Sequence, residues 1–146
     1  LATREIDLEG VQLVSDWIAT EVSPYTTYAQ WRAANFGIED SGAGASDQDA
    51  DGDGVTNRFE YLTHTDPKDA GSVWKAIFEV SGEDASLHFT GLPDRTIRAY
   101  RSSDMEKWNL WDTTGNDGIP VPAVTKTIQG PVNGGREFFR LSIEER

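Results

Sequence analysis

The spacing of hydrophobic residues divides the chain into a helical half and a strand-rich half. Between residues 8 and 19, apolar residues recur at three- and four-residue intervals, as in an amphipathic helix: Leu8, Val11, Val14, Trp17 and Ile18. A second helix is predicted from about Thr27 to Phe36, with Gly37 placed to cap its C-terminus. A third helix begins near Asn57, with Thr56 as its N-terminal cap, and ends before Pro67.

After Ser72 the pattern changes to the alternation of apolar and polar residues that β-strands show. Six strand-like runs are predicted, at residues 73–80, 86–89, 97–102, 109–113, 125–129 and 137–143. Turn-forming residues separate these runs, as in Gly82-Glu-Asp and Asn133-Gly-Gly. Short strands at intervals of roughly ten residues indicate a small antiparallel sandwich or barrel.

These patterns predict an α+β chain in three parts. Residues 1–24 have the pattern of a helical tail of a preceding domain, residues 25–72 that of a helical segment with an acidic loop, and residues 73–146 that of a small antiparallel β-sandwich of immunoglobulin-like character. The chain begins at Leu1 without an initiator methionine or a signal-like segment, so we expect a processed or excised piece. No run approaches the roughly eighteen apolar residues of a membrane helix, so we expect no membrane insertion.

The negative charge is concentrated in one segment. The net charge of the chain is -12, and nine carboxylates between Glu39 and Asp69 are opposed only by Arg58 and Lys68. Such crowding destabilises a folded chain unless a cation neutralises it, and two basic side chains are too few. A polyanion is also repelled by phosphate backbones, so nucleic acid is not an expected partner.

Residues 49–60 have the ligand spacing of a calcium-binding loop. Carboxylates occupy positions 1, 3 and 5, a glycine follows at position 6, and a glutamate at position 12 closes the coordination sphere. The predicted ligands are Asp49, Asp51, Asp53, the main-chain carbonyl of Val55, and Glu60, and Asn57 at position 9 can coordinate through a water. Magnesium is a weaker alternative because it prefers rigid octahedral sites that retain several waters. A solvated acidic run without metal is the other alternative.

The loop departs from a paired EF-hand in its Gly/Ala-rich entering segment, in Thr56 at position 8 and in having no second loop. The Asp-x-Asp-x-Asp-Gly run, a short helix and then Thr65-Asp66-Pro67 more closely resemble the single calcium loops of dockerin-like and thrombospondin type 3-like segments. The resemblance covers residues 47–69. It implies structural calcium, and it leaves open a second ion that uses Asp47, Asp66 or Asp69.

A wider resemblance rests on four further motifs: Tyr28-Ala-Gln-Trp31, Asn35-Phe36-Gly37, Ser102-Ser103-Asp104…Trp108 and Phe138-Phe139-Arg140-Leu141. Together with the loop they resemble a C-terminal cassette of large secreted bacterial proteins. That resemblance implies a non-catalytic accessory module, extracellular or periplasmic, whose partner is an upstream domain or another protein. The first eighteen residues resemble the closing helix of a cytochrome c-like domain.

No catalytic constellation is evident, so we predict that the chain is not an enzyme. It contains no cysteine, which excludes disulfides, thiolate zinc sites and a thiol nucleophile, and its only imidazoles are His64 and His88. Two alternatives remain open beside the accessory module. Trp108 and Trp111 can stack on sugar rings as in a carbohydrate-binding module, although we expect at least one of these rings to pack in the core. A surface-attachment or assembly tail with a protein partner is the other alternative.

Overall fold

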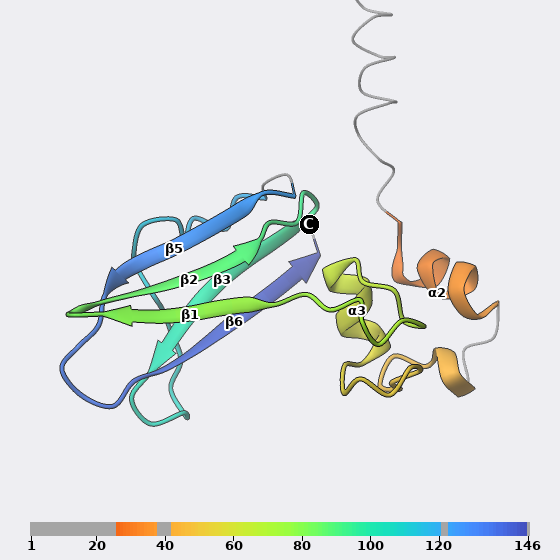
Figure 1. Cartoon of the computed structure of the whole chain (residues 1–146), viewed down its shortest axis with the longest axis horizontal. Coiled ribbons are helices and arrows are strands. Elements are labelled where there is room, and N and C mark those ends of the chain that lie inside the picture. The colour runs from red at the N-terminus through yellow and green to blue at the C-terminus, as the bar shows by residue number, and fades with distance from the viewer. Residues whose placement is uncertain (1–25, 38–41, 121–122, 146) are drawn as a thin grey trace, which may run out of the picture.

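The computed structural model describes residues 26–37, 42–120 and 123–145 (Figure 1). In this part of the chain two short α-helices and a 3-10 turn precede six strands in two small antiparallel sheets, which is an α+β arrangement. The helix predicted at residues 8–19 lies outside the described residues. No helix of the described ranges is both long and apolar enough to cross a membrane.

The first described helix, α2 (Tyr28–Phe36), begins and ends where its capping residues predict. The Thr27 hydroxyl accepts a hydrogen bond from the Gln30 N–H at 3.3 Å, and the Gln30 side chain accepts one from the Thr27 N–H at 2.9 Å. This reciprocal capping box satisfies two N–H groups that a helix end leaves unpaired. At the other end Gly37 has φ 89° and donates its N–H to the Ala33 carbonyl.

The second helix, α3 (Asn57–Thr63), confirms the predicted start at Asn57. The Thr56 hydroxyl caps it by accepting from the Phe59 N–H at 3.4 Å. The helix ends at His64, which adopts a left-handed conformation with φ 59°. A one-turn 3-10 helix, η1 (Gly42–Gly44), takes the place of a longer helix before the acidic loop.

Each of the six predicted strand runs contains a strand. One sheet has the order β1-β2-β5, from Ala76–Ser81, Asp84–Thr90 and Thr125–Pro131. The other has the order β4-β3-β6, from Asn109–Leu110, Arg95–Ser102 and Phe138–Glu145. The run predicted at residues 109–113 is only two residues long as a strand. It stops because Trp111 enters the core and its carbonyl accepts from the Asn116 side chain at 2.7 Å.

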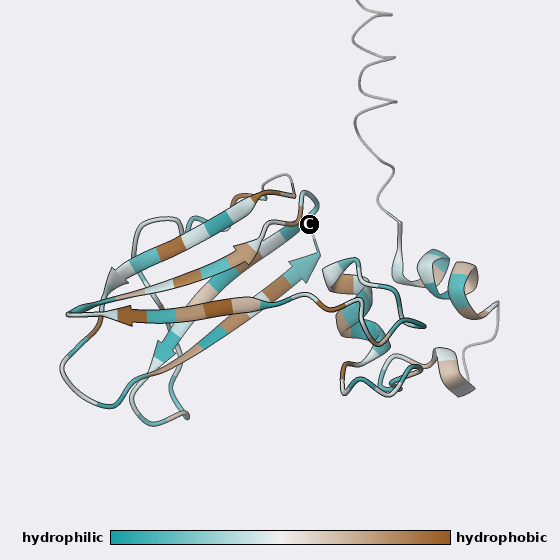
Figure 2. Cartoon of the chain, viewed as in Figure 1, coloured by the Kyte–Doolittle hydropathy of each residue, from teal (hydrophilic) through white to brown (hydrophobic). Residues whose placement is uncertain are grey.

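The core lies between the two sheets and follows the alternation along their strands (Figure 2). Leu87 of β2 pairs with Ile128 of β5, and both are buried. From the other sheet Phe139 of β6 packs its ring 4.9 Å from that of Trp111. Strand β1 differs from this pattern because it lies at a sheet edge and all six of its residues are exposed.

Candidate metal centre

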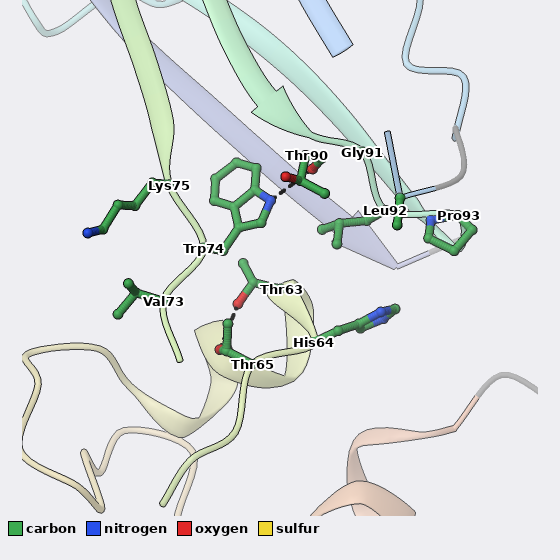
Figure 3. A pocket seen from close by; sticks show the side chains of 11 residues that line it. Thr63, His64, Thr65, Val73, Trp74, Lys75, Thr90, Gly91, Leu92 and Pro93 are labelled. Atoms are coloured by element: carbon green, nitrogen blue, oxygen red, sulfur yellow. Dashed lines mark hydrogen bonds between the residues drawn. The ribbon is translucent and has the colours of Figure 1, made fainter. Parts of the chain in front are cut away.

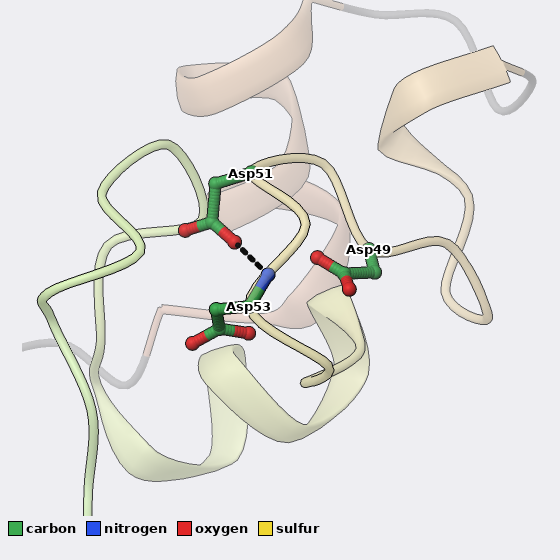
Figure 4. Close-up of side chains that lie close together, drawn as sticks. All are labelled: Asp49, Asp51 and Asp53. Carbon is green, nitrogen blue, oxygen red and sulfur yellow. Dashed lines mark hydrogen bonds between the residues drawn. The ribbon is translucent and has the colours of Figure 1, made fainter.

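The structure brings together the three aspartates of the acidic loop. Asp49, Asp51 and Asp53 lie between η1 and α3, and each offers a carboxylate oxygen within 4.8 Å of those of the other two (Figure 4). Oxygen-only donors at this separation suit a hard divalent cation. The predicted positions 1, 3 and 5 therefore converge on one point.

Hydrogen bonds from the loop's own backbone hold the first aspartate in place. Asp49 Oδ1 accepts from the Gly52 N–H at 2.7 Å, and its Oδ2 accepts from the Gly54 N–H at 2.8 Å. These N–H groups, that of Gly54 first, lower the pKa of Asp49 below its ordinary value, so the carboxylate is ionised at neutral pH. Gly52 and Gly54 have φ of 80° and 94°, a left-handed conformation that glycine adopts without strain.

The other two aspartates each use one oxygen to shape the loop. Asp51 Oδ1 accepts from the Asp53 N–H at 3.2 Å, and Asp53 Oδ1 accepts from the Val55 N–H at 2.7 Å. The Oδ2 atoms of Asp51 and Asp53 are buried and have no hydrogen-bond partner. A buried carboxylate oxygen without a partner is costly, so these two oxygens could be stabilised by a metal ion.

Glu60 supplies a second and independent indication of a cation. Its side chain lies in the first turn of α3, is only 1% exposed, and has no hydrogen-bond partner at either carboxylate oxygen. Burial, followed by the negative charges of Asp51 and Asp53, raises the pKa of Glu60 to about 7. A carboxylate in this position is stabilised by a positive charge, and no basic side chain of the described residues pairs with it.

Asn57 has a role that the sequence did not predict. It is 0% exposed, and its Nδ2 donates to the carbonyl oxygens of Ala43 and Ala45 at 2.6 and 2.7 Å. The side chain thus ties η1 to the start of α3. On the other side of η1 a Cβ at Gly44 would lie 2.8 Å from Phe36 Cβ, so this turn packs directly against α2.

The remaining acidic residues of the segment lie outside the aspartate group. Asp66 Oδ1 accepts from the Lys68 N–H at 3.0 Å, and Asp69 Oδ1 accepts from the Gly71 N–H at 2.9 Å. Asp66 nevertheless contributes to the raised pKa of Glu60. A second ion at Asp47, Asp66 or Asp69 stays a prediction, because the described residues do not gather these side chains into a group.

The two histidines and the tryptophan pair occupy different environments. His64 is exposed and its Nε2 lies 3.0 Å from Asp94 Oδ1, while His88 bonds the hydroxyls of Ser86 and Thr127 at 3.0 Å each. Trp111 is 1% exposed, which confirms that one ring of the tryptophan pair packs in the core. Only Trp108 remains accessible for stacking on a ligand.

A cavity of about 320 Å³ lies between the end of α3 and the strands (Figure 3). Several polar groups on its wall already have partners within the protein. The Trp74 indole N–H donates to the Thr90 carbonyl at 2.9 Å, and the hydroxyls of Thr63 and Thr65 are 3.1 Å apart. Because these groups are hydrogen-bonded within the protein, the cavity is a weaker candidate for a ligand-binding site than the acidic loop.

Comparisons of the chain with protein-family models, with curated proteins and with solved structures found no match. The geometry of the loop is therefore the main indication of what the chain does. The described residues unite Asp49, Asp51 and Asp53. Glu60 is not a member of this group, but it is buried without a partner and lies near enough for the charges of the aspartates to raise its pKa. The Val55 carbonyl remains a predicted ligand.

Proposed function

We propose that residues 49–60 hold one calcium ion in an EF-hand-like loop and that this ion has a structural role. The observation that carries the proposal is Glu60, a glutamate that is 1% exposed and has no partner for either oxygen. An ion among the three aspartates would give this carboxylate the positive charge that its burial requires. The ligands would be Asp49, Asp51, Asp53, the Val55 carbonyl and Glu60.

Calcium suits these residues better than magnesium. Calcium accepts six to eight oxygen ligands in a flexible geometry, whereas magnesium demands a near-octahedral arrangement and usually keeps several waters. The loop offers four carboxylates, and one of them, Glu60, can bind through both oxygens. Zinc is less suited still, because it favours nitrogen and sulfur ligands, and the neighbouring His64 is engaged by Asp94.

The ion would act by fixing the loop to α3. That helix is itself anchored on two sides: the Tyr61 hydroxyl donates to the Thr26 carbonyl before α2 at 2.7 Å, and Arg58 pairs with Glu145 of β6 at 2.9 Å. Calcium bound at Glu60 would therefore stabilise the packing of α2 and of the strands around one helix. This supports a mechanical role for the ion rather than a signalling one.

On this basis the chain is proposed to be a non-catalytic accessory module, with an immunoglobulin-like sandwich formed by its two sheets. We place it in a secreted or periplasmic protein, because extracellular calcium near millimolar saturates even a weak loop of this type. The module would set the position of its strands relative to an upstream domain or a partner protein.

Thermal unfolding with and without calcium tests the proposal. The wild-type protein and a Glu60→Gln variant are melted in calcium and in chelator, and calcium binding is measured by calorimetry. Glu83→Gln, an exposed change in the β1–β2 turn, serves as the matched control. At calcium 100-fold above its Kd, we expect wild type and Glu83→Gln to gain about 3 kcal/mol of unfolding free energy, and Glu60→Gln to gain far less.

Two results would contradict the proposal. Identical wild-type melts in calcium and in chelator would remove the structural role. Equal calcium affinity in Glu60→Gln and Glu83→Gln would show that the ion is not bound where Glu60 lies. The same melts with magnesium in place of calcium test which metal the loop prefers. If magnesium stabilised the wild-type protein as much as calcium or more, the assignment of calcium would be wrong.

A further inference from the structure

A second feature of the molecule lies on the outer face of the β4-β3-β6 sheet, away from the acidic loop. Ile97 and Ala99 of β3 are buried in the core, so Arg98 and Tyr100, which alternate with them, face outward. The register pairs Tyr100 with Arg140 of β6 and with Leu110 of β4. We call Arg98, Tyr100, Trp108, Leu110 and Arg140 the outer patch.

The two arginines of the outer patch have no carboxylate partner within the described part of the chain. By contrast, Arg58, Arg95, Arg101 and Lys126 each lie within 4.0 Å of a carboxylate. On the outer face itself Glu144 accepts from the Ser142 hydroxyl at 2.9 Å. The net charge of -12 repels an anion at long range, so binding here would depend on the local charge of Arg98 and Arg140, which occupy diagonal positions on β3 and β6 and lack carboxylate partners among the described residues.

Each arginine of the outer patch is held in a defined place. The Arg140 guanidinium carbon lies 4.5 Å from the ring centre of Trp108 and 5.6 Å from that of Tyr100. The guanidinium of Arg98 packs on Gly118, where a Cβ would come within 2.8 Å of its Nε. Pre-positioned cations lose less entropy on binding than freely rotating ones do.

The loop after β3 holds the Trp108 ring beside Arg140. The Ser102 hydroxyl accepts from the Met105 N–H at 2.9 Å, and Asp104 Oδ1 accepts from the N–H groups of Glu106 and Lys107 at 2.9 Å each. The Trp108 indole then donates to the Met105 carbonyl at 3.1 Å. The Ser102-Ser-Asp104…Trp108 motif is thus a rigid turn that presents an aromatic ring to this face.

We propose that the outer patch binds an acidic polysaccharide. A guanidinium group recognises a carboxylate or a sulfate through two parallel hydrogen bonds. Leu110 is 46% exposed, and Tyr100 and Trp108 are half-buried with Arg140 over their rings, so the apolar surface for the C–H face of a sugar ring consists of Leu110 and of the parts of the two rings that Arg140 leaves open. An acidic peptide would supply the negative charge but no rigid sugar rings to pack on the apolar surface. We therefore favour the polysaccharide as the partner. The inference does not rest on calcium binding.

The test compares polymers and variants in a direct binding assay, such as calorimetry at low and high salt. The polymers are polygalacturonate, which is carboxylated, dextran sulfate, neutral dextran as the uncharged control, and polyglutamate as the peptide control. The variants are Arg140→Gln, Arg98→Gln and Trp108→Ala, with Lys75→Gln as the matched loss of one exposed charge before β1. All are assayed in calcium, and their melts are recorded beforehand to establish that each is folded.

We expect wild type to bind one or both acidic polysaccharides, more weakly at high salt, and not to bind dextran. Each outer-patch variant should lose about tenfold in affinity, and Lys75→Gln should stay within about twofold of wild type. Polyglutamate bound as tightly as the polysaccharides would assign the patch to a peptide partner and overturn the proposal. Equal losses for Lys75→Gln and Arg140→Gln, or no binding at low salt, would overturn it as well.

The same assay separates this inference from the calcium proposal. Folded Glu60→Gln should keep the polysaccharide affinity of wild type, because the outer patch contains no residue of the loop. Polymer binding that survives Arg140→Gln but disappears in Glu60→Gln would instead indicate a calcium bridge between the polymer and the loop. That outcome would contradict the proposal that the outer patch binds the polymer, and it would leave the calcium proposal standing.

Discussion

Arg95 Nη2 donates a hydrogen bond of 3.1 Å to the main-chain carbonyl of Tyr61, the residue that follows Glu60. The Arg95 Nε donates to the next carbonyl, that of Leu62, at 3.2 Å. A helix leaves its last carbonyls unpaired, and here a side chain from β3 satisfies two of them. Arg95 is 3% exposed, and Asp94 balances its charge at 2.6 Å. The helix that carries Glu60 is thereby fixed to the strands.

Replacing Arg95 should weaken the attachment of α3 to the strands. Arg95→Met would leave two helix carbonyls without their donor and the Asp94 carboxylate with His64 as its remaining partner. Removing one member of a buried charge pair costs about 3–5 kcal/mol, and we expect a loss of that size in urea unfolding. Arg136→Met, at an exposed position before β6, should change stability by less than about 0.5 kcal/mol. A loss below about 1 kcal/mol in Arg95→Met would show that this contact does not join the halves.

The pH dependence of the metal-free protein should reveal the buried state of Glu60. Its pKa is raised to about 7, so the folded chain binds a proton that the unfolded chain releases near the ordinary value of 4.5. The stabilising effect of this proton is complete below pH 4.5 and is lost as the pH rises through about 7. A shift of this size corresponds to roughly 3 kcal/mol. The measurement is urea unfolding in chelator between pH 5.5 and 8.5, a range in which Asp49 stays ionised.

Glu60→Gln is the control for that profile, because glutamine has nearly the same shape and no charge. In chelator the variant should be more stable than wild type at pH 8, and its stability should depend less on pH. Calcium should reverse the order, since the ion needs the carboxylate. If wild type and variant give parallel profiles in chelator, the pH dependence has another source and Glu60 is not buried as an unpaired acid.

The ligand spacing was predictable because a calcium loop is local: twelve consecutive residues carry all of its donors. The start of α3 and the ends of α2 were equally local, since single capping residues determine them. Burial of Glu60 was not predictable in this way, because it depends on how α3 packs against α2 and the strands. Arg95 had no signal at all, as its partners in α3 precede it by 33 and 34 residues.

The burial of the two tryptophans was also only partly predictable from the sequence. Strand alternation predicts that the rings of Trp108 and Trp111 do not both face the same side of the strand, but it does not say which ring is buried in the core. The structure buries Trp111, because the chain leaves β4 there and Asn116 holds the turn by three hydrogen bonds of 2.7 to 2.8 Å. Trp108 instead follows the turn that begins at Ser102 and Asp104. The sequence showed these two residues as part of a motif but did not show that they form this turn.

Asn57 offers a test between two roles for position 9 of the loop. If it coordinates the ion through water, Asn57→Asp should preserve or strengthen calcium binding. If its main role is to donate to Ala43 and Ala45, aspartate removes both donors at a site that is 0% exposed. We expect the second result, with a loss of about 3 kcal/mol in calcium and in chelator alike. Asp69→Asn, which changes an exposed acid nearby, should leave the chelated protein within about 0.5 kcal/mol of wild type.

Gly130 tests how tightly the segment after β4 closes on β5. A Cβ at Gly130 would collide with the side chain of Thr113, whose hydroxyl donates to the Gln129 carbonyl, and Thr114 forms a bridge with Gln129. Gly130→Ala should therefore cost about 1–3 kcal/mol, because neither the strand nor the segment can move without breaking these bonds. Gly134→Ala is the matched control, since nothing lies within 4 Å of a Cβ there and its φ is not left-handed. It should be neutral or stabilise the protein by up to about 1 kcal/mol through the unfolded chain. Equal stability of the two alanine variants would mean that the segment is not packed against β5 as described.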